Sequence, residues 1–131
     1  MILITDDNAQ NLYLARFLLE KEGHRIAEAT NGQEAISAAQ GETFDLILMD
    51  IQMPVMDGLE ASKAILKYEE ESDLEHIPVI ALTADALPGD REKYISEGMD
   101  DYATKPLDIG AIKKIISTHC SGSLTSKSKV K

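Results

Sequence analysis

The sequence predicts an α/β fold in which helices cover both faces of a parallel β-sheet. Short apolar runs alternate five times with longer amphipathic segments, as in consecutive strand–helix units. The run over residues 45–49 is continuously apolar after Asp45, which is typical of a central strand covered on both faces. The 131 residues suffice for one such domain and contain no internal repeat.

The first half of the chain is predicted to contain three strands and two helices. The first helix is indicated by Leu12, Ala15 and Leu19, which share one face, and by Gly23, which ends it. The elements in chain order are a strand over 2–5, a helix from Asn8 or Ala9 to Glu22, a strand over 25–29, an Ala-rich helix over 32–40 and a strand over 45–49.

The second half repeats the alternation after a loop over 52–57, in which Pro54 cannot donate a ladder hydrogen bond. Pro88 and Gly89 lie where the fourth helix should begin, so we expect its first turn to be weak or delayed. The elements are a helix from Gly58 to about Tyr68, a charged connection over 69–75, a strand over 78–82, a helix ending near Glu97, a strand over 102–103 and a helix marked by Ile109, Ile112, Ile115 and Ile116.

Charge and composition limit the classes of function. The net charge is −10, and because residues 121–131 carry three lysines and no acid, the preceding residues carry −13. Such a body should not bind nucleic acid directly. No apolar run approaches the roughly 20 residues of a membrane helix, so we expect no direct membrane contact. Cys120 is the single cysteine, which suits the cytoplasm. We expect a domain over 1–120 and a disordered Ser/Lys-rich tail over 121–131.

Four of the five predicted strands are followed by polar or charged side chains. Because a parallel sheet places its ligand site beyond the carboxyl ends of its strands, we expect these groups to meet at one edge. They are Asp6 and Asp7 after the first strand, Asp50 after the third, Thr83 after the fourth and Lys105 after the fifth. Ala84 follows Thr83, and Pro106 follows Lys105.

Three carboxylates at one edge raise each other's pKa unless a cation compensates them. A hard ion such as Mg²⁺, or Mn²⁺ in its place, resolves that conflict. We expect Asp7 to bind it directly, Asp6 through water, and the backbone carbonyl of Gln52 to complete the shell. A cation beside the Lys105 ammonium suits a phosphoryl group. Asp50 ends the most buried strand, so we interpret it as the nucleophile that accepts this group.

The segments ILITDDN (2–8), DLILMDIQMPVMDG (45–58), IALTA (80–84) and GMDDYATKP (98–106) occur in an order and at separations that resemble the receiver domain of two-component response regulators. The resemblance covers residues 1 to about 118. It implies a flavodoxin-like (βα)5 three-layer sandwich with sheet order 2-1-3-4-5. It also implies that Asp50 takes a phosphoryl group from a phosphohistidine, and that the Thr83 hydroxyl, the Ala84 N–H and Lys105 contact this group. Tyr102 would be an aromatic switch, and the Lys105–Pro106 peptide bond would be cis.

Segments 51–58 and 98–102, together with Asn8 and Asn11 at the first helix, most resemble receivers attached to hybrid sensor histidine kinases. The resemblance implies that the partners are a histidine kinase or a histidine phosphotransfer domain. It also implies a possible homodimer through the face formed by the fourth helix, fifth strand and fifth helix. Such a domain catalyses its own phosphoryl transfer and slow dephosphorylation, but it acts mainly as a signalling switch.

Each candidate residue also has a plain structural interpretation. Asp6 and Asp7 could cap the first helix. Thr83 could cap a strand end, Lys105 could be a solvated surface residue, and Tyr102 could be a static, half-buried edge-strand residue. We interpret Glu69–Glu71 as a solvated helix end. We expect His24, His76 and His119, which show no ligand spacing, to be exposed.

Three other functions are compatible with parts of the pattern. A Mg²⁺-dependent phosphatase or phosphotransferase with an aspartyl-phosphate intermediate is the main alternative, although haloacid dehalogenase enzymes place Asp-x-Asp after the first strand, and here the acids are adjacent. A flavodoxin-like FMN carrier should have a Ser/Thr/Gly-rich phosphate loop where this chain has Asp6-Asp7-Asn8. A phosphorylation-independent binding module would need none of the site residues.

Overall fold

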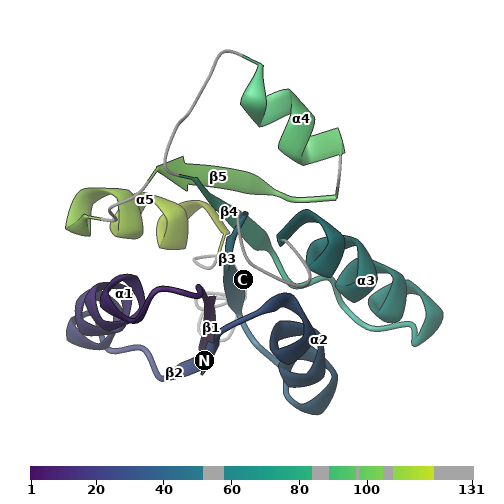
Figure 1. The fold of residues 1–131 in the computed structure, drawn as a ribbon, viewed down its shortest axis with the longest axis horizontal. Coiled ribbons are helices and arrows are strands. Elements are labelled where there is room, and N and C mark those ends of the chain that lie inside the picture. The colour runs from purple at the N-terminus through teal and green to yellow at the C-terminus, as the bar shows by residue number, and fades with distance from the viewer. Residues whose placement is uncertain (52–57, 84–88, 97, 105–107, 120–131) are drawn as a thin grey trace, which may run out of the picture.

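The computed structural model of this protein describes residues 1–51, 58–83, 89–96, 98–104 and 108–119. Within those ranges five strands alternate with five helices (Figure 1). The elements are β1 (Ile2–Thr5), α1 (Ala9–Lys21), β2 (Ile26–Ala29), α2 (Gly32–Gly41), β3 (Leu46–Asp50), α3 (Gly58–Glu71), β4 (Val79–Thr83), α4 (Asp90–Ser96), β5 (Asp101–Thr104) and α5 (Ile109–His119). The predicted α/β alternation is confirmed.

The strands form one parallel sheet in the order β2-β1-β3-β4-β5, as predicted. The apolar residues 46–49 of the predicted strand therefore lie at the centre, in β3. Helices α1 and α5 cover one face of the sheet, and α2, α3 and α4 cover the other (Figure 1). This arrangement brings the carboxyl ends of all five strands to a single edge.

Alternate side chains of the central strands point into two separate cores. Leu46 and Leu48 pack with the buried residues of α1 and α5, whereas Ile47 and Met49 pack with those of α2, α3 and α4. All four of these side chains are almost completely buried. Burial on both faces explains why β3 is continuously apolar rather than alternating. On α1 the predicted stripe is buried, at Leu12, Ala15 and Leu19.

The strand boundaries differ slightly from the predicted ones. β4 begins at Val79 rather than at Pro78, because proline has no N–H to donate; the Pro78 carbonyl still accepts a hydrogen bond from the Ile47 N–H at 2.9 Å. β3 includes Asp50, which lies opposite Leu82 of β4. β5 spans four residues rather than the predicted two, and all four are paired with residues of β4. The delayed start of the fourth helix is confirmed, since α4 begins at Asp90, beyond Gly89.

Two predictions about polar residues are wrong. Glu69 is only 3% exposed, not solvated, and α3 continues past Tyr68 to Glu71. The Glu69 side chain accepts a hydrogen bond from the Ile77 N–H at 2.9 Å, which ties the last turn of α3 to the chain leading into β4. Of the three histidines only His76 is exposed; His24 and His119 are partly buried, and His119 contacts Asp101 at 3.1 Å.

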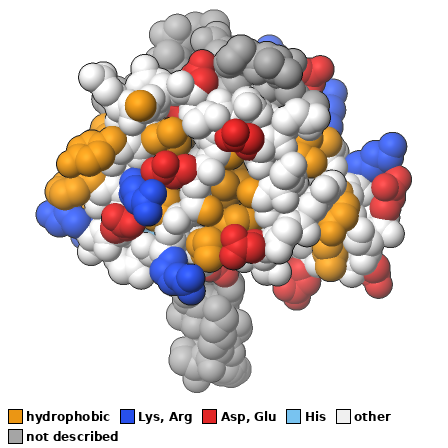
Figure 2. Space-filling view, turned by 60° about the horizontal axis from the view of Figure 1, so that its bottom comes forward, with side chains coloured by type: hydrophobic (Ala, Val, Ile, Leu, Met, Phe, Trp, Pro, Cys, Tyr) orange, Lys and Arg blue, Asp and Glu red, His pale blue; other side chains and the backbone are white. Residues whose placement is uncertain are grey.

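The described residues on the face of the molecule in Figure 2 form no single large patch of one charge or of hydrophobic side chains. Figure 2 shows acidic, basic and hydrophobic side chains interspersed on that face. Among the described residues, no helix combines the length and the apolar character needed to cross a membrane.

Candidate functional site

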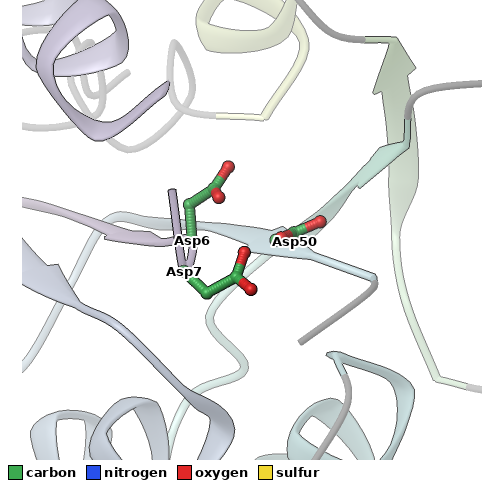
Figure 3. A group of neighbouring side chains, drawn as sticks. All are labelled: Asp6, Asp7 and Asp50. Atoms are coloured by element: carbon green, nitrogen blue, oxygen red, sulfur yellow. The ribbon is translucent and has the colours of Figure 1, made fainter. Parts of the chain in front are cut away.

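Three carboxylates meet at the carboxyl edge of the sheet. β1 pairs with β3, and Thr5 lies opposite Met49, so the residues that follow Thr5 come to lie beside Asp50. Asp6, Asp7 and Asp50 each contribute an oxygen to a group in which all three oxygens lie within 4.8 Å of one another (Figure 3). The sheet thus brings together acids that are 43 to 44 residues apart in sequence, as predicted.

The three carboxylates differ in exposure. Asp6 and Asp50 are buried, with 1% and 2% of their surface exposed, whereas Asp7 is exposed. Two buried carboxylates beside a third lose hydration and repel one another, which is unfavourable without a compensating cation. An all-oxygen set of this kind fits a hard divalent ion such as Mg²⁺.

The start of α1 positions Asp6 without using it as a helix cap. The Asp6 N–H donates to the carbonyl of Ala29 at 3.1 Å, and one Asp6 carboxylate oxygen accepts from the Asn8 N–H at 2.9 Å. Asn8 is the N-cap, and its side chain accepts from the N–H groups of Gln10 and Asn11. The alternative that Asp6 and Asp7 cap this helix is therefore wrong, and both acids face the site.

Asp50 is held by close packing between β3 and the start of α3. The N–H of Ile51 donates to the carbonyl of Leu82, and the N–H of Gly58 donates to the carbonyl of Ile51 at 3.0 Å. A Cβ atom on Gly58 would collide with the carbonyl oxygen of Asp50 and lie 2.9 Å from Cγ of Met49. Only glycine fits here, so Gly58 positions the end of β3. The sequence around Gly58 does not show which backbone atoms this glycine approaches.

Thr83 ends β4, the strand beside β3, and is partly buried. It lies opposite Thr104, the last residue of β5. The described strand ends therefore bring Thr83 to the same edge as the acids. The other predicted site residues, Gln52, Ala84, Lys105 and Pro106, lie outside the described residues.

Tyr102 lies on β5, the edge strand, opposite Ala81 of β4. It is partly buried and packs on the core between the sheet and α2, α3 and α4. Its ring centroid is 6.0 Å from that of Tyr94 in α4, with the planes tilted by 56°. Tyr94 is 6% exposed. Its role is not predictable from the sequence, because an aromatic residue in a short helix has no distinctive local signal.

Comparisons with known proteins give one family. Residues 2–117 match the family model of the response regulator receiver domain. The chain is 41% identical to the sensor protein GacS of Pseudomonas syringae over 115 residues, which are 88% of this chain but 13% of that protein. It is 38% identical to the polar-differentiation response regulator DivK of Brucella anthropi, with coverage of 90% and 94%.

Comparison with solved structures indicates the same family. The receiver domain of the sensor histidine kinase PA1611 from Pseudomonas aeruginosa, solved with a magnesium ion in its active-site cleft, is 35% identical with a TM-score of 0.78, covering 90% of this chain and 94% of that one. The receiver domain of Ssk1 from Saccharomyces cerevisiae, crystallised with the histidine phosphotransfer protein Ypd1, is 32% identical with a TM-score of 0.88, covering 93% and 89%.

Proposed function

Because this chain belongs to the response regulator receiver domain family and is a receiver of two-component phosphorelay signalling, we propose that Asp50 is its phosphoacceptor. The observation that carries the proposal is the position of Asp50: a buried carboxylate at the end of the central strand, within 4.8 Å of the carboxylate oxygens of Asp6 and Asp7. The domain boundaries, 1–120 for the receiver and 121–131 for a tail, are part of the proposal.

The chemistry is a transfer between two covalent adducts. A carboxylate oxygen of Asp50 attacks the phosphorus of a phosphohistidine, the P–O bond forms, and the P–N bond breaks. The leaving imidazole takes a proton from solvent. Attack of water on the same phosphorus later forms a new P–O bond, breaks the bond to the Asp50 oxygen, and releases inorganic phosphate and the Asp50 carboxylate. Rigid placement at the end of a buried strand favours this step because the nucleophile is already oriented.

Receiver domains bind Mg²⁺ in the active site. In this chain we assign the ion to the carboxylates of Asp6, Asp7 and Asp50. We propose the backbone carbonyl of Gln52 as a further ligand and Mn²⁺ as an ion that can replace Mg²⁺. The bound ion supplies positive charge to the carboxylates and to the phosphoryl oxygens. We assign the Thr83 hydroxyl, the Ala84 N–H and Lys105 to the phosphoryl oxygens as well.

We further propose that phosphorylation shifts a two-state equilibrium in which Thr83 and Tyr102 take part. Thr83 and Tyr102 lie on adjacent paired strands, β4 and β5, which supports a connection between them. A homodimer through α4, β5 and α5 would use the same region.

Receivers act with histidine phosphotransfer proteins and kinases, and we propose a helical phosphohistidine protein as the direct partner here. The exposed face of α1, a helix that begins beside the acids, suits such a partner. Tyr13 and Phe17 are 73% and 50% exposed and stack with their centroids 6.5 Å apart, and the Lys21 ammonium lies 5.5 Å from the Phe17 centroid. The chain spans about an eighth of the sensor kinases it matches first, so its place in a cytoplasmic hybrid kinase is also a proposal.

The decisive experiment is labelling with radioactive acetyl phosphate, which needs no protein partner. We expect Mg²⁺-dependent incorporation that is lost in Asp50→Asn and after chelation of the ion. Asp73→Asn is the matched control, because Asp73 is exposed, lies on the α3–β4 connection and has φ +57°, a conformation that Asn adopts readily. Undiminished labelling of Asp50→Asn would overturn the proposal.

A further inference from the structure

His76 joins three segments at the edge of the sheet opposite the acids. It lies on the connection between α3 and β4, and both of its ring nitrogens face carboxylates. Nδ1 lies 2.7 Å from Oε1 of Glu69, at the end of α3. Nε2 lies 2.8 and 2.9 Å from the two carboxylate oxygens of Asp100, which immediately precedes β5.

The two carboxylates are also held by backbone N–H groups. Glu69 accepts from the Ile77 N–H at 2.9 Å, and Asp100 accepts from the Val79 N–H at 2.8 Å. The Asp100 N–H in turn donates to the Val79 carbonyl at 2.9 Å. Asp100 is thus the residue through which the start of β5 is fastened to the start of β4.

The number of N–H donors that the two contacts require determines the charge of the His76 ring. An ionised carboxylate only accepts hydrogen bonds, and a neutral imidazole has one donor and one acceptor nitrogen. A neutral ring would therefore aim a lone pair at either Glu69 or Asp100. Both contacts are satisfied together only by the imidazolium, which donates from both nitrogens.

Burial makes this charge important. Glu69 is 3% exposed, and a buried carboxylate without a cation beside it is strongly unfavourable. Partial burial of the ring lowers the pKa of His76, but the hydrogen bonds and the negative charges of Glu69 and Asp100 outweigh it, so the pKa of His76 is raised above its ordinary value.

The charged groups around His76 come from two packed elements and its own segment. α3 contributes Glu69, the α4–β5 connection contributes Asp100, and Glu75 precedes His76 in sequence; β4 begins with the apolar Val79. On the α5 side, His119 contacts Asp101 through one ring nitrogen at 3.1 Å. A neutral His119 can make that single hydrogen bond, so this second contact does not require a charged ring.

We propose that protonated His76 is a pH-sensitive clasp that holds the start of β5 against the end of α3 and the start of β4. Deprotonation breaks one of its two contacts and loosens the segment that leads into Tyr102. A raised folded-state pKa means that the stabilisation is fully present below the unfolded value and is lost as the pH rises through the folded pKa. The clasp does not depend on which residue accepts phosphoryl.

The test uses the unphosphorylated 131-residue chain and nitrogen-15 NMR of the histidine rings. We expect His76 to show two protonated nitrogens at about pH 6 and to titrate above the ordinary pKa of a histidine. Amide exchange in β5, corrected for intrinsic base catalysis, should accelerate several-fold as His76 deprotonates, while β1 amides stay protected. A neutral His76 ring with a single protonated nitrogen at about pH 6 would overturn the proposal. Amide exchange rates in β5 that do not change as His76 titrates would overturn it as well.

Two variants sharpen the test. Asp100→Asn should move the pKa of His76 down towards its ordinary value, whereas His119→Gln, the matched control, should leave it unchanged. His76→Gln should lower Tm by several degrees at about pH 6 and by less at about pH 9, where the wild type has lost its charge as well. A Tm difference that is equal at both pH values would contradict the proposal.

Discussion

The backbone of Gly58 lies against the carbonyl of Asp50, so closely that a Cβ atom at residue 58 has no room. The start of α3 and the end of β3 therefore form one rigid corner, and the proposed nucleophile is part of it.

We expect Gly58→Ala to destabilise the fold by about 1–3 kcal/mol, because the added methyl group must displace the Asp50 carbonyl or the Met49 side chain. Denaturant unfolding measures this change. Gly41→Ala is the control, because Gly41 ends α2 with nothing within 4 Å of the added atom. Equal stabilities for the two variants would contradict the close approach.

We expect Asp7→Asn to weaken Mg²⁺ binding by on the order of tenfold, because it removes one negative charge from the oxygen set. Asp7 is exposed, so the substitution should leave the fold intact. Isothermal titration of Mg²⁺ measures the affinity, with Asp73→Asn as control. Wild-type affinity in Asp7→Asn would remove this residue from the metal site.

Asn8→Ala should cost about 1 kcal/mol of unfolding free energy, because the Asn8 side chain accepts from two N–H groups of the first turn of α1. Thermal unfolding measures the loss. Gln10→Ala, which keeps the cap and changes an exposed side chain of the same helix, should be nearly neutral. An equal loss in both variants would mean that the cap contributes nothing.

Thr83→Ala should slow labelling by acetyl phosphate roughly tenfold or more, because it removes the proposed hydroxyl donor to the phosphoryl group. Thr83→Ser keeps the hydroxyl and should retain most of the rate. The measurement is the initial rate of Mg²⁺-dependent incorporation. If the Ser and Ala variants slow equally, the methyl group rather than the hydroxyl is what matters.

Phe17→Ala should reduce transfer from a phosphorylated histidine phosphotransfer domain several-fold while leaving labelling by acetyl phosphate unchanged. Only the protein donor needs the exposed aromatic face of α1. Leu74→Ala is the control, because Leu74 is an apolar side chain of similar exposure, 52%, that lies on the α3–β4 connection. A parallel loss with both donors would point to misfolding or to the site itself.

Local sequence patterns were sufficient to predict most of the fold. The alternation of apolar runs placed the five strands and five helices of the described residues, with ends displaced by at most three residues. The continuous apolar run before Asp50 placed that residue at the end of the central strand. These predictions succeed because side-chain periodicity is a local consequence of helix and strand geometry.

The candidate site was predictable only as a set of strand ends. That Asp6, Asp7, Asp50 and Thr83 share one edge follows from parallel strands, and it is confirmed. The different burial of Asp6 and Asp7 was not predictable, because adjacent residues carry the same local signal and only packing against other strands separates them.

The clasp at His76 shows most clearly what only the tertiary structure decided. The charged stretch around Glu69 indicates a solvated helix end, whereas Glu69 is buried. His76 is exposed as predicted, but its sequence neighbours do not show that it contacts two carboxylates. Asp100, 24 residues beyond His76, becomes its partner only because β5 pairs with β4. The sequence by itself determined the elements and the strand on which each acid lies, through periodicity; which distant side chains meet, and which lose their water, was decided by the strand order and the packing that folding imposes.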